Sequence, residues 1–102
     1  MKIAFKMKLK PGFGEEYTRR HNQIWPELSA LLKENSVSDY SIFLDEETDT
    51  LFAVQQQNGN SSQDLGANEI VRKWWAYMAD IMEVNADNSP KSIPLEMVFH
   101  LD

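Results

Sequence analysis

The spacing of hydrophobic and polar positions changes several times along the 102-residue chain, and each change predicts a new element. Residues 2–9 place apolar side chains at every second position, with Lys and Ala between them, which is the pattern of a half-buried strand. From about residue 14 to residue 34 the apolar spacing becomes helical. Pro26 interrupts it, because proline lacks a backbone N–H and crowds the preceding turn. We expect a kink there, or two short helices with Pro26 in the first turn of the second.

The rest of the chain alternates between strand, turn and helix patterns. It first predicts strands at 37–44 and 50–56, joined by the acidic loop 45–49. A turn follows at 58–62, in which Ser61 or Ser62 caps a second helical region that ends near Met82. The chain then predicts a loop at 85–94 and a fourth strand at 95–102. The order predicts an α+β, ferredoxin-like βαββαβ fold, in which an antiparallel sheet carries its helices on one face. The length fits one domain spanning residues 1–102.

This architecture leaves one face of the sheet uncovered. The segments 37–44 and 50–56 nevertheless carry apolar or aromatic residues on both faces, with Phe43, Phe52 and Val54 among them. An apolar sheet face of this kind usually meets a second subunit. We therefore predict a homodimer joined sheet to sheet.

Charge and composition exclude several classes of function. Ten basic residues against sixteen acidic residues give a net charge of −6, which repels nucleic-acid phosphates and acidic membrane surfaces. Because the chain has no Cys, disulfides and cysteine nucleophiles are excluded. No stretch approaches the roughly 18 apolar residues of a membrane span, and the N-terminus alternates Lys with apolar residues instead of forming a secretory signal. We expect a cytoplasmic protein that binds neither nucleic acid nor membrane.

The first helical region contains an unusual polar stripe. On one helix, Tyr17, His21 and Trp25 lie four residues apart and share a face. A buried stripe is normally aliphatic, so these side chains either satisfy their polar atoms within the core or form the wall of a pocket. The second histidine, His100, falls in the last strand, where we expect it to face solvent or an interface. Two histidines without a third ligand do not predict a metal site.

The second helical region contains the adjacent pair Trp74-Trp75. Neighbouring side chains on a helix point about 100° apart, so we expect one indole to pack inward and the other to line an edge or a cavity. Indole faces suit the apolar C–H patches of sugars, and the hydroxyls of Tyr17 and Tyr40 can hydrogen-bond to sugar oxygens.

Four blocks of sequence together resemble one family, the L-rhamnose mutarotases, which are small cytoplasmic sugar epimerases. The blocks are YxxRHNxIWPEL at 17–28, the strand with Tyr40, RKWWAYM at 72–78 and NADNSP at 85–90. The resemblance implies a dimeric α/β barrel made of two ferredoxin-like subunits, L-rhamnose as substrate, and no cofactor. It also implies that His21 is the proton donor and that the sugar is contacted by four aromatic residues: Tyr17, Tyr40, Trp74 and Trp75.

The implied reaction needs one acid and one base. Interconverting the α and β anomers of a pyranose requires a proton at the ring oxygen while another leaves the C1 hydroxyl. An imidazole, with a pKa near ~6.5, alternates readily between these states. The partner for the second proton stays open between a bound water, a tyrosine hydroxyl and Asp87, and we favour a water held by a tyrosine.

Two alternative functions are a haem-degrading monooxygenase of the same superfamily and a non-enzymatic dimeric ligand-binding module.

Overall fold

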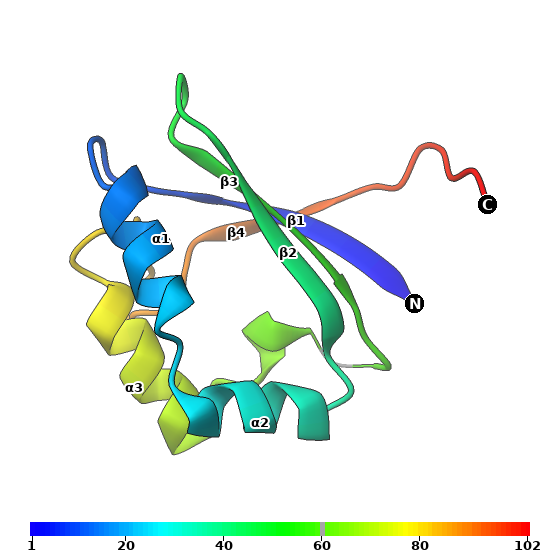
Figure 1. Ribbon diagram of the computed structural model, residues 1–102, viewed down its shortest axis with the longest axis horizontal. Helices are drawn as coiled ribbons and strands as arrows, with labels where there is room; N and C mark the ends of the chain where they lie inside the picture. Colours follow the sequence, from blue (N-terminus) through cyan, green and yellow to red (C-terminus); the bar gives the residue numbers. More distant parts are fainter. Residues whose placement is uncertain (60) are drawn as a thin grey trace.

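The structure, a computed structural model, describes residues 1–59 and 61–102 (Figure 1). Its elements are β1 (Lys2–Lys8), α1 (Gly14–Asn22), α2 (Pro26–Glu34), β2 (Ser38–Asp45), β3 (Thr50–Gln56), the 3-10 helix η1 (Ser62–Asp64), α3 (Glu69–Met78) and β4 (Ser92–Leu95). The four strands form one sheet in the order β2-β3-β1-β4, and every neighbouring pair is antiparallel. The predicted α+β class and the single antiparallel sheet are confirmed. None of the helices in the described part of the chain is long and apolar enough to cross a membrane.

The helices gather on one side of the twisted sheet (Figure 1). The alternation in β1 and β3 turns Phe5, Met7, Leu51 and Ala53 toward them, and these side chains are buried in the main core. Burying this face contributes most of the stability, since each large apolar side chain removed from water contributes roughly 1.5–3 kcal/mol. The other face of the sheet carries no helix in the described part of the chain.

The first helical region divides at Pro26, as predicted. α1 ends at Asn22, and Pro26 occupies the first turn of α2, where its missing N–H would have had no partner within the helix. Trp25 stands just before it with an extended backbone (φ −61°, ψ 131°). The expected stripe of three aromatic residues on one helix is therefore wrong for Trp25, which lies beyond the end of α1.

α3 is shorter than the pattern predicted. The turn at 58–62 leads into η1, which Ser61 caps, while Asn68 caps α3 by accepting from the Ile70 N–H at 2.9 Å; Asn60 of that turn lies outside the described residues. α3 then ends at Met78 and not near Met82. The backbone after it pairs with the end of β1, because Lys10 N–H donates to Ile81 O at 2.9 Å. Ile81 and Met82, which continue the helical spacing, are thus buried in the core although they lie beyond the end of α3.

The fourth strand is displaced from its predicted position. We expected a loop at 85–94 and a strand at 95–102, whereas β4 covers Ser92–Leu95 and pairs with β1 from Ala4 to Met7. Pro94 is tolerated because β4 is an edge strand, where a missing N–H removes no bond to a further neighbour. Residues 96–102 have no regular secondary structure, are exposed, and lead away from the body of the molecule (Figure 1). They alternate like a strand, but the pairing of this segment with β1 ends at Leu95, opposite Ala4.

Candidate active site

The five predicted site residues line one cavity of about 600 Å³ between the helices and the sheet. Tyr17 and His21 come from α1, Tyr40 from β2, and Trp74 and Trp75 from α3. Aliphatic and methionine side chains complete the wall, and they include Met7, Leu28, Leu32, Ile42, Val71 and Met78. An apolar cavity with a few polar side chains directed to the same space is the usual form of a small-molecule site.

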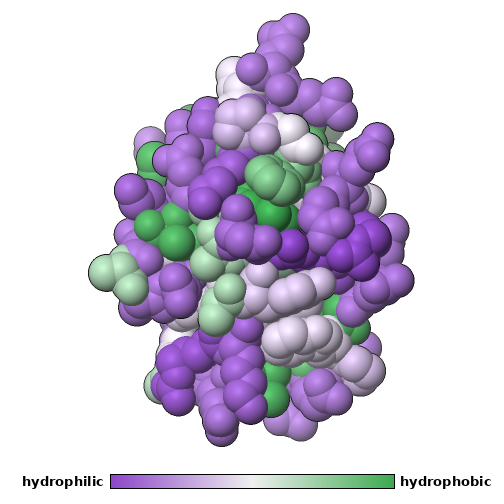
Figure 2. Space-filling view, turned by 90° about the vertical axis from the view of Figure 1, so that its left-hand side faces the viewer, coloured by the Kyte–Doolittle hydropathy of each residue, from purple (hydrophilic) through white to green (hydrophobic). Residues whose placement is uncertain are grey.

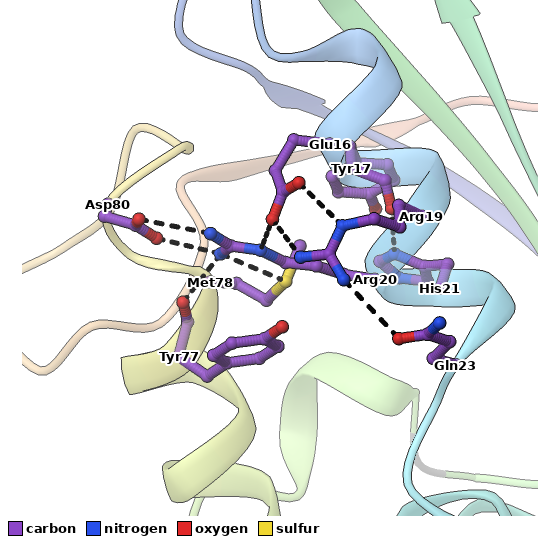
Figure 3. Close-up of polar contacts among 9 residues, drawn as sticks. All are labelled: Glu16, Tyr17, Arg19, Arg20, His21, Gln23, Tyr77, Met78 and Asp80. Carbon is purple, nitrogen blue, oxygen red and sulfur yellow. Dashed lines mark hydrogen bonds and ion pairs between the residues drawn. The ribbon is translucent and has the colours of Figure 1, made fainter.

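α1 fixes the relation between Tyr17 and His21. The two rings lie one helical turn apart and stack, with centroids 4.2 Å apart and planes inclined by 27°. The His21 Nδ1 lies 3.2 Å from the Tyr17 backbone oxygen (Figure 3). A carbonyl oxygen can only accept, so Nδ1 must carry the proton of the neutral ring. That assignment leaves Nε2 as an acceptor.

Burial controls the charge of His21. The surrounding protein lowers the pKa of His21 below the ordinary value of 6.5, since a buried imidazolium loses hydration, and the hydrogen bond to Tyr17 O offsets part of this. The ring is therefore neutral at pH 7 and ready to accept a proton. Burial, with a smaller contribution from nearby Tyr40, raises the pKa of Tyr17 well above 10, so its hydroxyl stays protonated.

Both tryptophans of the adjacent pair line the cavity, although the helical spacing predicted that only one would line an edge or a cavity while the other packed inward. Trp74 and Trp75 are each only 8% exposed. Trp74 presents an edge to His21, with ring centroids 5.4 Å apart and planes inclined by 88°. Trp75 packs against the loop before α3, so closely that a Cβ on Gly66 would lie 2.8 Å from its ring. The cavity extends across two sides of α3, which is why both indoles reach it.

Trp25 supports the cavity from outside. It does not line the cavity but packs against the core. Its ring meets the Trp74 ring edge-on at 5.1 Å and stacks on Tyr77 at 5.7 Å. Edge-on and stacked aromatic pairs each contribute roughly 0.5–1.5 kcal/mol beyond their buried area. Trp74 is thus held between the imidazole and a second indole.

A polar cluster that the sequence did not reveal lies at Tyr40. The Tyr40 hydroxyl is 3.3 Å from the Ser62 hydroxyl, and Ser62 is held by the fully buried Gln55 through two hydrogen bonds of 3.0 Å each. Burial raises the pKa of Tyr40, although the bond to Ser62 partly opposes this. One signal was present in the sequence: Gln55 occupies an inward position of β3 in register with Leu51 and Ala53, where a polar side chain requires a partner.

Arg20 joins the two helices that carry the site. Its guanidinium, buried between α1 and the end of α3, donates to Glu16 at 2.7 Å, to Asp80 at 2.8 and 3.2 Å, and to Tyr77 O at 2.8 Å (Figure 3). It also lies over the Tyr77 ring, 4.5 Å from the centroid. Arg19, the next residue, pairs with the same Glu16 but remains half-exposed. Sequence alone did not distinguish these neighbouring arginines.

Two other candidates lie apart from the cavity. His100 is exposed and its Nε2 bonds to Asp102 at 2.9 Å. Asp87, one of the possible partners for the second proton, is exposed, and hydrogen bonds from Ser89 lower the pKa of its carboxyl group. Neither lines the cavity. Among residues 1–59 and 61–102, no group of three or more His, Asp or Glu side chains is placed to hold a metal ion.

Comparison with known proteins agrees with this arrangement. The family model for L-rhamnose mutarotase matches residues 2–101. A protein named L-rhamnose mutarotase from Bacteroides thetaiotaomicron is 67% identical over 100 residues, which are 97% of this chain and 96% of that protein. One of the same name from Formosa agariphila is 63% identical over 102 residues, covering 99% and 98% of the two chains. A crystal structure of an L-rhamnose mutarotase from Formosa agariphila superposes with a TM-score of 0.94 at 61% identity, covering 100% of this chain and 99% of that one. The chain belongs to the L-rhamnose mutarotase family.

Proposed function

We propose that the protein interconverts the α and β anomers of L-rhamnose by acid–base ring opening and reclosure without a cofactor. The observation that carries the proposal is the convergence of His21, Tyr17, Tyr40, Trp74 and Trp75 on one cavity. The family resemblance assigns roles to the same five residues. Family membership supplies the identity of the sugar.

His21 is the acid–base group of the proposed reaction. Its neutral ring, with Nδ1 bonded to Tyr17 O, first accepts the proton of the C1 hydroxyl at Nε2. As that proton leaves, its electron pair forms the aldehyde carbonyl, the C1–ring-oxygen bond breaks, and the ring oxygen takes a proton from a second donor. The aldehyde group then rotates and the ring oxygen attacks its other face, returning its proton to the second donor while the imidazolium returns the first proton to O1. His21 is thus the base in opening and the proton donor in closure, so one residue suffices at this oxygen.

The aromatic residues hold the sugar while the proton moves. The faces of Trp74 and Trp75 provide flat apolar surfaces for the methyl and C–H groups of a 6-deoxy sugar, and the hydroxyl of Tyr17 provides a hydrogen bond. Because Tyr17 stacks directly on His21, a bound oxygen atom at one ring lies beside the other. This proximity is the usual source of rate in a reaction that needs only positioned proton donors and acceptors.

Saturation-transfer NMR on L-rhamnose measures anomer exchange directly. The wild-type chain should accelerate the exchange, and His21→Ala should remove most of the acceleration, by roughly 10²–10⁴-fold, the usual contribution of a positioned acid–base group. His100→Ala is the matched control, since the second histidine is exposed and outside the cavity. Exchange that is unchanged in His21→Ala would exclude this residue, and a wild-type chain that gives no acceleration would exclude the activity.

We further propose that two chains pair through the open face of the sheet to form a dimeric α/β barrel. The side of the molecule that carries α1 and α3 is largely hydrophilic (Figure 2). By contrast, the open sheet face exposes 63% of Phe43, 37% of Phe52, 57% of Ile93 and 38% of Leu95. Phe43, Phe52 and Ile93 lie in one row across the sheet, because Phe43 pairs with Phe52 and both Phe52 and Ile93 pair with Lys6 between them. Leu95 lies in the neighbouring row, opposite Ala4.

Light scattering at micromolar concentration tests the assembly. We expect twice the mass of one 11.8 kDa chain, and we expect Phe52→Glu to shift the population toward monomer. A mass of one chain for the wild type would refute the homodimer. Location in the cytoplasm stays a prediction.

A further inference from the structure

The direction of the hydrogen bonds around Ser62 determines where the Tyr40 proton can go. The Ser62 backbone N–H donates to Gln55 Oε1 at 3.0 Å, which fixes the orientation of the Gln55 amide. Its Nε2 therefore donates to Ser62 Oγ, also at 3.0 Å. Gln63 Nε2 donates to the same oxygen at 3.3 Å. Two N–H donors occupy both lone pairs of Ser62 Oγ, so its own hydrogen must be donated elsewhere.

Tyr40 is the acceptor of that hydrogen. The Tyr40 oxygen lies 3.3 Å from Ser62 Oγ. If Ser62 donates to Tyr40, the phenolic hydrogen of Tyr40 has no role in the Ser62 bond and remains available to a ligand in the cavity that Tyr40 lines. The cavity then offers two complementary groups to a bound sugar: an acceptor at His21 Nε2 and a donor at the Tyr40 hydroxyl.

We propose that Tyr40 is the second proton-transfer residue of the mutarotation, and that Ser62 and Gln55 are positioning residues that direct its proton toward the substrate. This inference rests on the proposed function. On ring opening, His21 removes the C1 hydroxyl proton, and the electron pair of that O–H bond forms the carbonyl. The C1–ring-oxygen bond breaks with its electrons on the ring oxygen, which takes the proton of Tyr40. On closure both transfers reverse, so the protein returns to its starting state.

Ser62 has a second effect on the same step. As the Tyr40 oxygen releases its proton it gains negative charge in a buried setting, where charge is costly. The Ser62 O–H already points at that oxygen and stabilises the developing charge without reorganisation, as preorganised donors do in other active sites. Gln55 is fully buried and holds the Ser62 backbone and hydroxyl together, so its position defines the geometry of the whole chain of hydrogen bonds.

Three single variants and one double variant test the proposal by anomer-exchange NMR at several sugar concentrations, which separates kcat from KM. Tyr40→Phe should lower kcat by roughly 10²-fold or more with a small change in KM, since it removes a proton donor and little packing. Ser62→Ala should lower kcat about tenfold, and Ser62→Thr, which keeps the hydroxyl, should restore most of it. Adding Ser62→Ala to Tyr40→Phe should cause no further loss, because Ser62 acts through Tyr40. Tyr77→Phe is the control, as Tyr77 lies outside the cavity.

Distinct results overturn the proposal. If Tyr40→Phe raises KM and leaves kcat unchanged, Tyr40 only binds the sugar. If Ser62→Ala lowers kcat equally in the wild-type and Tyr40→Phe backgrounds, Ser62 does not act through Tyr40. Should a variant fail to fold, as judged by circular dichroism, the comparison of Ser62→Ala with Ser62→Thr still decides the role of the hydroxyl. A wild-type chain without activity would instead reject the proposed function itself.

Discussion

The neighbouring residues Arg19 and Arg20 offer a sharp test of how the site is held together. Both pair with Glu16, but only Arg20 is buried and also reaches Asp80 and Tyr77 O at the end of α3. We expect Arg20→Met, which keeps most of the aliphatic packing, to separate α1 from α3. Arg19→Met changes the same charge at the surface and serves as the matched control.

The contacts of Arg20 set the expected magnitude. Hydrogen bonds to charged groups contribute roughly 1.5–3 kcal/mol each when buried. Breaking a fully buried pair costs about 3–5 kcal/mol, because the remaining partner stays uncompensated. Here the Asp80 side chain is 66% exposed and can hydrate, and Glu16 keeps its bonds to Arg19. We therefore expect about 2 kcal/mol for Arg20→Met, near the low end of these ranges, which lowers Tm by roughly 10 °C for a domain of this size.

Thermal unfolding and anomer exchange are the two measurements, both at one fixed protein concentration because any dimer makes Tm concentration-dependent. Arg20→Met should lower Tm and also slow the exchange, since His21 on α1 is no longer held beside Trp74 on α3. Arg19→Met should resemble the wild type in both, as exposed ion pairs are screened by water. Equal effects of the two substitutions would refute the reasoning, because burial would then not distinguish the two arginines.

Three further predictions follow from the site. Because burial lowers the pKa of His21, the unfolded chain binds this proton at higher pH than the folded chain. The stability that depends on the neutral ring is therefore complete above about pH 6.5, and it is lost as the pH falls from there through the lower pKa of the folded chain. The anomer-exchange rate should likewise persist as the pH falls to 6.5 and decline only below that pH. An NMR titration of the imidazole with a midpoint above 6.5 would contradict this. Gly66→Ala should destabilise the fold by roughly 1–3 kcal/mol and raise KM, since the new Cβ would lie 2.8 and 2.9 Å from the Trp75 ring; an unchanged Tm and KM would show that the ring moves freely. Trp25→Leu should loosen Trp74 and reduce the exchange rate less than Trp74→Leu does, because Trp25 supports the cavity from outside; an equal loss would place both indoles in the site.

The elements whose causes are local could be predicted directly from the sequence. Alternation identified the position of β1, and a run of β-branched and aromatic residues identified that of β3. The fixed backbone of Pro26 divided the first helical region, and all these signals depend only on neighbouring residues. The spacing of Tyr17 and His21 is set by one helical turn, so their position on one face of α1 was available from the sequence. Family resemblance then added Tyr40, Trp74 and Trp75, which lie too far along the chain for any spacing rule to join them to His21.

Contacts between distant segments set the remaining features, and these contacts exist only in the folded chain. α3 ends early because the residues after it pair with the end of β1, and β4 lies at 92–95 because these are the residues that pair with Ala4–Met7 of β1. The tautomer of His21 follows from the position of one carbonyl oxygen, and the proposed donor role of Tyr40 rests on where Gln55 and Ser62 meet across the fold. Hydrogen-bond direction and burial are properties of three-dimensional surroundings, and no periodicity in a chain encodes them.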